Sequence, residues 1–135
     1  MPIDPAQARG ATFEKTYASW DQDDVILYHL GIGAGAGKPT DPKELEYTYE
    51  RSLKVLPSFA VIPVFSALGH LGAIPGVSIN FAMVLHGEQD VEIHRPIPTA
   101  AKIETTGRVA GLYDKGKAAL IVLEVASSLD RKSVV

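Results

Sequence analysis

The chain has 135 residues, enough for one domain with a real core, and its 46% hydrophobic and 21% charged content is typical of a soluble globular protein. A net charge of −3 offers no basic surface to nucleic-acid phosphates, and the absence of cysteine excludes disulfides and thiolate chemistry. This composition fits a reducing compartment, and we expect a cytoplasmic protein.

No targeting or membrane segment is expected. Residues 1–10 lack a basic stretch followed by an apolar one, so no signal peptide is predicted. The longest apolar-rich stretch, residues 55–79, is interrupted by three prolines, three glycines and His70, which does not suit a membrane span. We therefore expect a single domain over residues 1–135.

The first part of the chain predicts a strand, a capped helix and a glycine-rich loop. Residues 11–20 alternate in polarity and predict the strand. Asp21 has the position of a helix N-cap, with Asp23 and Asp24 in the first turn, where the helix dipole favours negative charge. The run 31–37 resembles a phosphate loop, but it follows a helix and lacks a Gly-Lys-Ser/Thr ending, so we interpret it as a flexible helix exit.

The middle of the chain predicts short elements. Residues 42–45 begin a helical turn, and the alternation at 46–50 predicts a strand. Residues 55–71 are apolar but punctuated by proline, which predicts two short helical turns, 57–62 and 63–70, in place of one long helix.

The last part of the chain predicts strands. Residues 84–94, 102–113 and 118–127 each have strand character, and the turn at 114–117 makes the last two a hairpin. Antiparallel strands with helices gathered earlier in the chain indicate an α+β architecture.

Five segments together resemble a known family. They read LYHLGIGAG (27–35), VLPSFAVI (55–62), LHGEQ (85–89), HRPIP (94–98) and YDKGKA (113–118). Their order and spacing resemble the N-terminal, non-catalytic half of MaoC-like, type 2 (R-specific) enoyl-CoA hydratases, a half that also occurs in the hydratase region of peroxisomal multifunctional enzyme type 2. One such motif would be weak, whereas five in order are specific.

The resemblance implies a hot-dog fold, in which an antiparallel sheet wraps around a central helix. In the family the first of two such units has a shortened helix, and the hollow that results takes the tail of an acyl-CoA. We expect the shortened helix at 55–71, with Leu56, Pro57 and Phe59 near the tail. Burial of each methylene there would contribute about 0.8 kcal/mol.

The resemblance also implies that this chain has no catalytic residues. The family takes its acid and base from a Gly-Asp-x-Asn-Pro-x-His segment in its second half, and hydration needs both groups. Here the only asparagine, Asn80, is followed by Phe81, so the segment is absent. No cofactor or metal is implied, since the CoA thioester is the substrate.

Two further positions are implied to contact the CoA ligand. In the family the His-Gly pair that matches His86 and Gly87 approaches it, and so does the lysine that matches Lys115. A hydrogen bond from His86, close backbone approach at Gly87 and a phosphate or pantetheine contact from Lys115 are the expected roles. Alternatively, His86 is an ordinary sheet residue and Lys115 a solvated turn lysine.

Other polar residues have simpler interpretations. Glu88, Asp90 and Glu92 alternate and could suggest a metal site, but exposed charge is the better interpretation. His29 and His70 are predicted to be structural.

The predicted partners are an acyl-CoA and a second hot-dog unit, either catalytic or a copy of this chain. In the family one more strand follows the one that matches 118–127, so we expect the last strand to be truncated or completed by a partner. Two other functions stay open: a hot-dog thioesterase, although residues 57–71 contain no carboxylate to activate water, and a structural subunit that binds nothing. The acyl chain could be fatty or steroid-derived.

Overall fold

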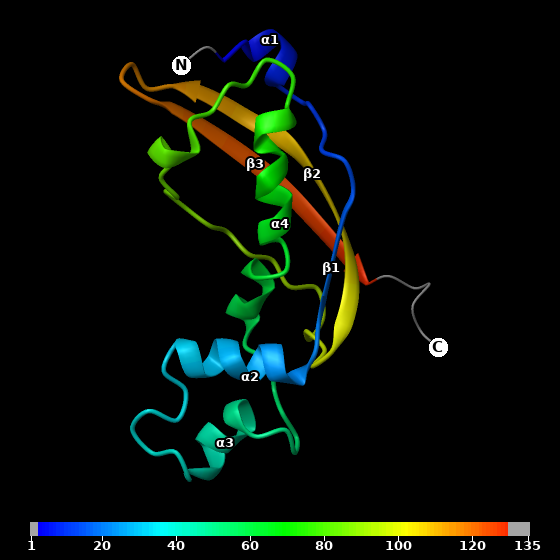
Figure 1. Ribbon diagram of the computed structural model, residues 1–135, viewed down its shortest axis with the longest axis vertical. Coiled ribbons are helices and arrows are strands. Elements are labelled where there is room, and N and C mark those ends of the chain that lie inside the picture. Colours follow the sequence, from blue (N-terminus) through cyan, green and yellow to red (C-terminus); the bar gives the residue numbers. More distant parts are fainter. Residues whose placement is uncertain (1–2, 130–135) are drawn as a thin grey trace. The chain divides into compact units, whose positions relative to one another are not determined.

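The computed structural model describes residues 3–129 and shows a three-stranded antiparallel sheet with helical segments that precede its two long strands (Figure 1). The sheet order is β1-β2-β3, with β1 at Thr16–Trp20, β2 at Ala101–Asp114 and β3 at Ala119–Leu129. The α+β prediction and the C-terminal hairpin are confirmed. None of the helices in the described chain has the length and apolar character that crossing a bilayer demands.

The helical segments are short. The α-helices are α1 (Pro5–Ala8), α2 (Gln22–Gly31), α3 (Pro42–Thr48) and α4 (Phe65–Leu68), and the 3-10 helices are η1 (Pro57–Val61), η2 (Gly69–Ala73) and η3 (Phe81–Met83). The predicted pair of short turns in the proline-rich stretch is confirmed as η1 and as α4 with η2.

The described residues form two compact units. One, here called the sheet unit, comprises residues 3–18, 64–89 and 104–128. The other, the helical unit, comprises residues 19–63, 90–103 and 129.

The core of the sheet unit lies between α4, η2 and the long strands. Its buried side chains are Ala8, Phe13, Leu71, Ile74, Val77, Val109 and Leu112. Leu68, Ile121 and Leu123 pack against them, while Leu120 and Val122 on the other face of β3 are exposed. The strand predicted at 118–127 thus has one face toward the core and one toward solvent.

The inner helix is as short as expected, because only four α-helical residues of α4 precede the five of η2. The expected open hollow is absent along this part of the sheet, however. Leu71 is buried in the core and Leu68 packs against it, so α4 and η2 cover the sheet residues beside them.

The hairpin turn depends on a left-handed glycine. Gly116 has φ 78°, and its N–H donates to Asp114 Oδ1 at 2.7 Å, while the Lys115 N–H donates to the Ala118 carbonyl at 2.9 Å. A side chain at this φ would be strained, so the glycine fixes the turn and the register of β2 on β3.

Two predicted strands are wrong. Residues 46–50 belong largely to α3, which begins after the N-cap Asp41 and continues to Thr48 because Tyr49 N–H still reaches the Leu45 carbonyl at 3.1 Å. Residues 84–94 are extended, but no described strand pairs with them, and they follow η3. Alternation gives a segment strand character, yet a strand also needs a hydrogen-bonding neighbour.

Candidate functional site

The helical unit begins with a well-capped helix. Asp21 Oδ1 accepts from the N–H groups of Asp23 (2.9 Å) and Asp24 (3.1 Å), and Asp24 Oδ2 accepts from the Asp21 N–H at 2.9 Å. This reciprocal capping box satisfies amides at the open end of α2 and confirms the predicted N-cap. The cap sets the helix phase so that Val25 and His29, one turn apart, are both fully buried.

The glycine-rich loop after α2 binds an anion of its own chain. The Gly35 N–H donates to Glu44 Oε2 at 2.7 Å, and both Gly33 and Gly35 have positive φ. The Glu44 carboxylate of α3 thus accepts a hydrogen bond from a backbone amide of the kind that a phosphate loop donates to its ligand. This geometry agrees with the interpretation of the loop as a helix exit.

An aromatic cluster lies at the centre of the helical unit. Phe59 is 1% exposed and makes edge contacts with the rings of Trp20 (5.6 Å) and Tyr28 (5.5 Å). Trp20 Nε1–H donates to the Pro98 carbonyl at 2.9 Å, and Tyr28 O–H donates to Ser58 Oγ at 2.9 Å. Phe59 therefore holds η1 on α2, and its proposed contact with a ligand stays a prediction.

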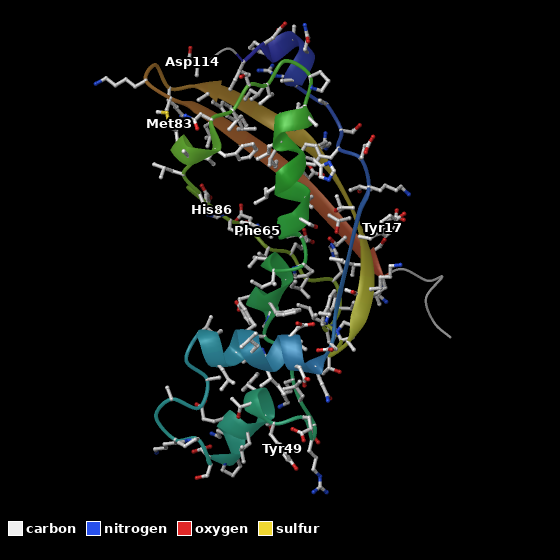
Figure 2. All side chains as sticks on the ribbon, viewed as in Figure 1. Tyr17, Tyr49, Phe65, Met83, His86 and Asp114 are labelled. Carbon is white, nitrogen blue, oxygen red and sulfur yellow. The ribbon has the colours of Figure 1, made fainter. Side chains whose placement is uncertain are left out.

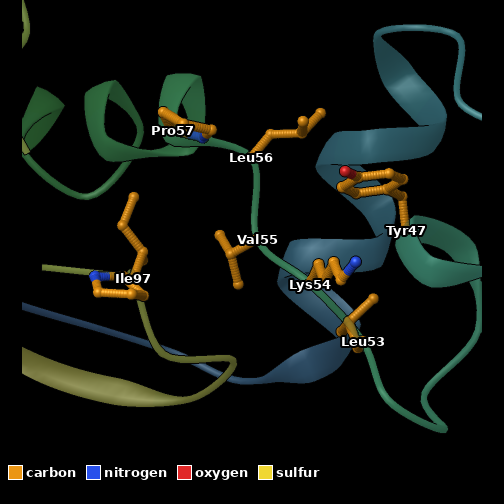
Figure 3. A pocket seen from close by; sticks show the side chains of 8 residues that line it. Tyr47, Leu53, Lys54, Val55, Leu56, Pro57 and Ile97 are labelled. Carbon is orange, nitrogen blue, oxygen red and sulfur yellow. The ribbon is translucent and has the colours of Figure 1, made fainter.

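A pocket of about 380 Å³ lies beside this cluster, in the same unit (Figure 3). It is lined by Tyr47, Leu53, Lys54, Val55, Leu56, Pro57, Pro96 and Ile97. Two of the predicted residues, the adjacent Leu56 and Pro57, are among these lining residues. Pockets that bind small ligands have volumes in this range and a mostly apolar lining with a few polar groups.

The cation in this lining is already paired. Lys54 Nζ lies 2.6 Å from Glu46 Oε2, and both side chains are substantially exposed. The hydrogen bond that Lys54 donates to Glu46, and then the negative charge of Glu46, raise the pKa of Lys54 above its ordinary value. Lys54 is therefore positively charged at neutral pH and lies at the solvent side of the pocket.

A buried histidine joins two walls of the pocket. His29 is 0% exposed; its Nδ1 lies 2.7 Å from the Tyr47 carbonyl, and its Nε2 lies 3.2 Å from the Leu56 amide nitrogen. The ring also packs edge-on against the Tyr47 ring at 5.5 Å. This agrees with the prediction of a structural role for His29.

The remaining predicted residues lie in the sheet unit and are exposed. His86 lies on the extended segment after η3 (Figure 2), where a ring nitrogen is 3.2 Å from Gln89 Oε1. Gly87 has open space around it, and Lys115 lies in the hairpin turn. The ligand contacts of these three residues stay predictions.

The acidic residues beyond His86 do not gather. Glu88, Asp90 and Glu92 are all exposed, as expected, and residues 3–129 contain no group of three His, Cys, Asp or Glu side chains placed to hold a metal ion.

Part of the pocket lies outside the predicted site residues. Tyr47 belongs to a segment predicted to be a strand, and Lys54 is not among the predicted ligand contacts. Pro96 and Ile97 also line the pocket, and the HRPIP motif that contains them is the sequence signal that points to this wall.

Comparisons with known proteins agree with the resemblance. Residues 18–135 match the family described as the MFE-2 hydratase 2 N-terminal domain. Enoyl-CoA hydratase ChsH3 of Mycobacterium tuberculosis is 37% identical over 95% of this chain and 45% of its own length. The peroxisomal enoyl-CoA hydratase 2 of Arabidopsis thaliana is 38% identical over 84% of this chain and 38% of its own length. The chain thus spans less than half of these relatives.

The fold is shared with a solved structure. The crystal structure of a MaoC-like dehydratase from Phytophthora capsici superimposes with a TM-score of 0.71 and 26% identity, over 94% of this chain and 44% of that one. The hot-dog prediction is confirmed by this similarity. Because some relatives are peroxisomal by name, the cytoplasmic location stays a prediction. The chain belongs to the MFE-2 hydratase 2 N-terminal family of MaoC-like, hot-dog enoyl-CoA hydratases.

Proposed function

We propose that this chain is the acyl-CoA-binding, non-catalytic part of a MaoC-like (R)-specific 2-enoyl-CoA hydratase or 3-hydroxyacyl-CoA dehydratase, and that a separate hot-dog unit supplies the catalytic Asp and His. The observation that carries this proposal is the open, largely apolar pocket beside Leu56 and Pro57. Each acyl methylene buried there would contribute about 0.8 kcal/mol.

The polar groups of this chain do not make up for the missing acid and base. Hydration requires activation of a water molecule, proton exchange at the α-carbon, and donors that polarise the thioester carbonyl. His86 is exposed, and its Nε2 lies 3.2 Å from the side-chain amide oxygen of Gln89, which is not a carboxylate that could orient a general base. Binding without turnover is what these groups support.

The sheet unit has features that favour a protein partner. β3 is the outer strand of the described sheet, so one of its edges has no described strand beside it. Large apolar side chains are also exposed in this unit, including Phe65 (70%) and Leu85 (92%). Exposed edges and apolar patches of this kind are usually covered by another chain or domain. We propose that a catalytic hot-dog unit, or a second copy of this chain, covers them.

The decisive experiment is calorimetric titration of the chain with trans-2-decenoyl-CoA, together with an assay for hydration and for release of free CoA. Micromolar binding without either reaction is expected, with hydration appearing when a catalytic hot-dog unit is added. Absence of binding would leave a structural subunit, and release of free CoA would indicate a thioesterase.

Single-residue variants test the predicted contacts. His86→Ala should weaken binding while the melting temperature stays within a few degrees, because the side chain is exposed. Lys115→Ala should also weaken binding, whereas Lys117→Ala, in the same exposed turn, is the matched control. Equal effects of the two lysine variants would indicate nonspecific attraction of the CoA phosphates.

A further inference from the structure

The two hydrogen bonds of His29 determine its protonation state. The Leu56 N–H can only donate, so Nε2 must present its lone pair to it at 3.2 Å. The Tyr47 carbonyl can only accept, so Nδ1 must carry the hydrogen at 2.7 Å. The buried ring is therefore neutral and in the Nδ1–H tautomer.

Both partners of His29 belong to residues that line the pocket. Tyr47 comes from α3, and Leu56 comes from the segment that leads into η1. His29, from α2, thus connects the wall at Tyr47 with the wall at Leu56, nine residues further along the sequence. We infer that His29 is the positioning residue of the proposed acyl-CoA pocket, and that its two hydrogen bonds fix the Leu56 wall relative to the Tyr47 wall. This inference rests on the proposed function for its ligand.

The physical basis is one donor paired with one acceptor at each ring nitrogen. A side chain at position 29 that cannot accept at the place of Nε2 would leave the Leu56 N–H without its acceptor. The bond to the Tyr47 carbonyl needs only a donor at the place of Nδ1. Loss of the acceptor therefore loosens one wall and keeps the other.

A pair of variants separates the two hydrogen bonds. In His29→Gln the amide oxygen can reach the place of Nε2 and accept from Leu56 at any pH. In His29→Asn the amide N–H takes the place of Nδ1 and serves Tyr47, but leaves the Leu56 N–H unpaired. His29→Gln should bind trans-2-decenoyl-CoA with an affinity close to that of the wild type, whereas His29→Asn should bind it about tenfold more weakly.

Spectroscopy on the ligand-free wild type provides an independent test. A scalar coupling between the Leu56 amide nitrogen and His29 Nε2 should be visible by NMR, and Nδ1 should be the ring nitrogen that carries the hydrogen. Failure of the wild type to bind trans-2-decenoyl-CoA would refute the proposed function, while this coupling still tests the wall. An Nε2–H tautomer, absence of the coupling, or equal behaviour of the Gln and Asn variants would overturn the inference.

Discussion

Phe59 is the side chain whose replacement tests the described core most directly. Phe59→Leu removes the ring from two edge contacts, with Trp20 and Tyr28, but keeps an apolar side chain in the site. Aromatic pairs of this kind contribute about 0.5–1.5 kcal/mol each beyond buried area, so we expect a loss of about 2 kcal/mol in the free energy of unfolding. At about 4 °C per kcal/mol, the melting temperature should fall by about 8 °C.

The assay uses a probe that the chain already carries. Trp20 is the single tryptophan and contacts the Phe59 ring, so its fluorescence during urea unfolding reports on the helical unit. Phe65→Leu is the matched control: Phe65 is 70% exposed, and the same substitution there should change stability by less than about 0.5 kcal/mol. Equal effects of the two substitutions, or a Phe59→Leu effect below about 0.5 kcal/mol, would refute the placement of Phe59 in the core.

Three further predictions concern a glycine pair, a helix cap and an ion pair. Gly76→Ala should lower the free energy of unfolding by about 1–3 kcal/mol in thermal unfolding, because φ is +74° and a Cβ would lie 2.9 Å from the Gln7 side chain. Gly87 has open space around it, so Gly87→Ala should leave stability unchanged and weaken CoA-ligand binding. Asp21→Ala should cost about 1 kcal/mol by the same measurement, because α2 loses its capping box. Glu46→Gln should lower the pKa of Lys54, which an NMR titration of Nζ would show as a shift to lower pH. In the wild type the ion pair is complete below the raised pKa of Lys54 and is lost as pH rises through it. An unchanged Lys54 titration would show that the ion pair does not form in solution.

The elements with strong local signals were predictable from the sequence. The Asp21 cap, the glycine exit of α2 and the 114–117 turn each depend on residues within a few positions of one another, and each is confirmed. The proline-punctuated stretch also behaved as predicted, because proline restricts its own φ and removes a backbone donor wherever it stands.

The failures have a common physical cause. At 46–50, alternating polarity competes with a helix already nucleated by Asp41, and capping decides the outcome. At 84–94 the sequence is suited to a strand, but strand formation depends on a neighbour that local sequence does not specify.

The site was only partly predictable for a similar reason. Leu56 and Pro57 were found through the family motif, whereas the pocket closes around them with Tyr47 and Ile97 from distant segments. The role of His29 depends on backbone atoms of residues that no spacing rule connects to it.

The outward-facing phenyl and thioether groups near η3 have a practical consequence. Phe81, Met83 and Leu85 are 55%, 74% and 92% exposed, on a chain whose net charge is only −3. A low net charge gives only weak electrostatic repulsion between molecules, and exposed apolar side chains favour self-association and adsorption to surfaces. Binding constants for this chain should therefore be compared across a dilution series, so that ligand uptake can be separated from clustering of the protein itself.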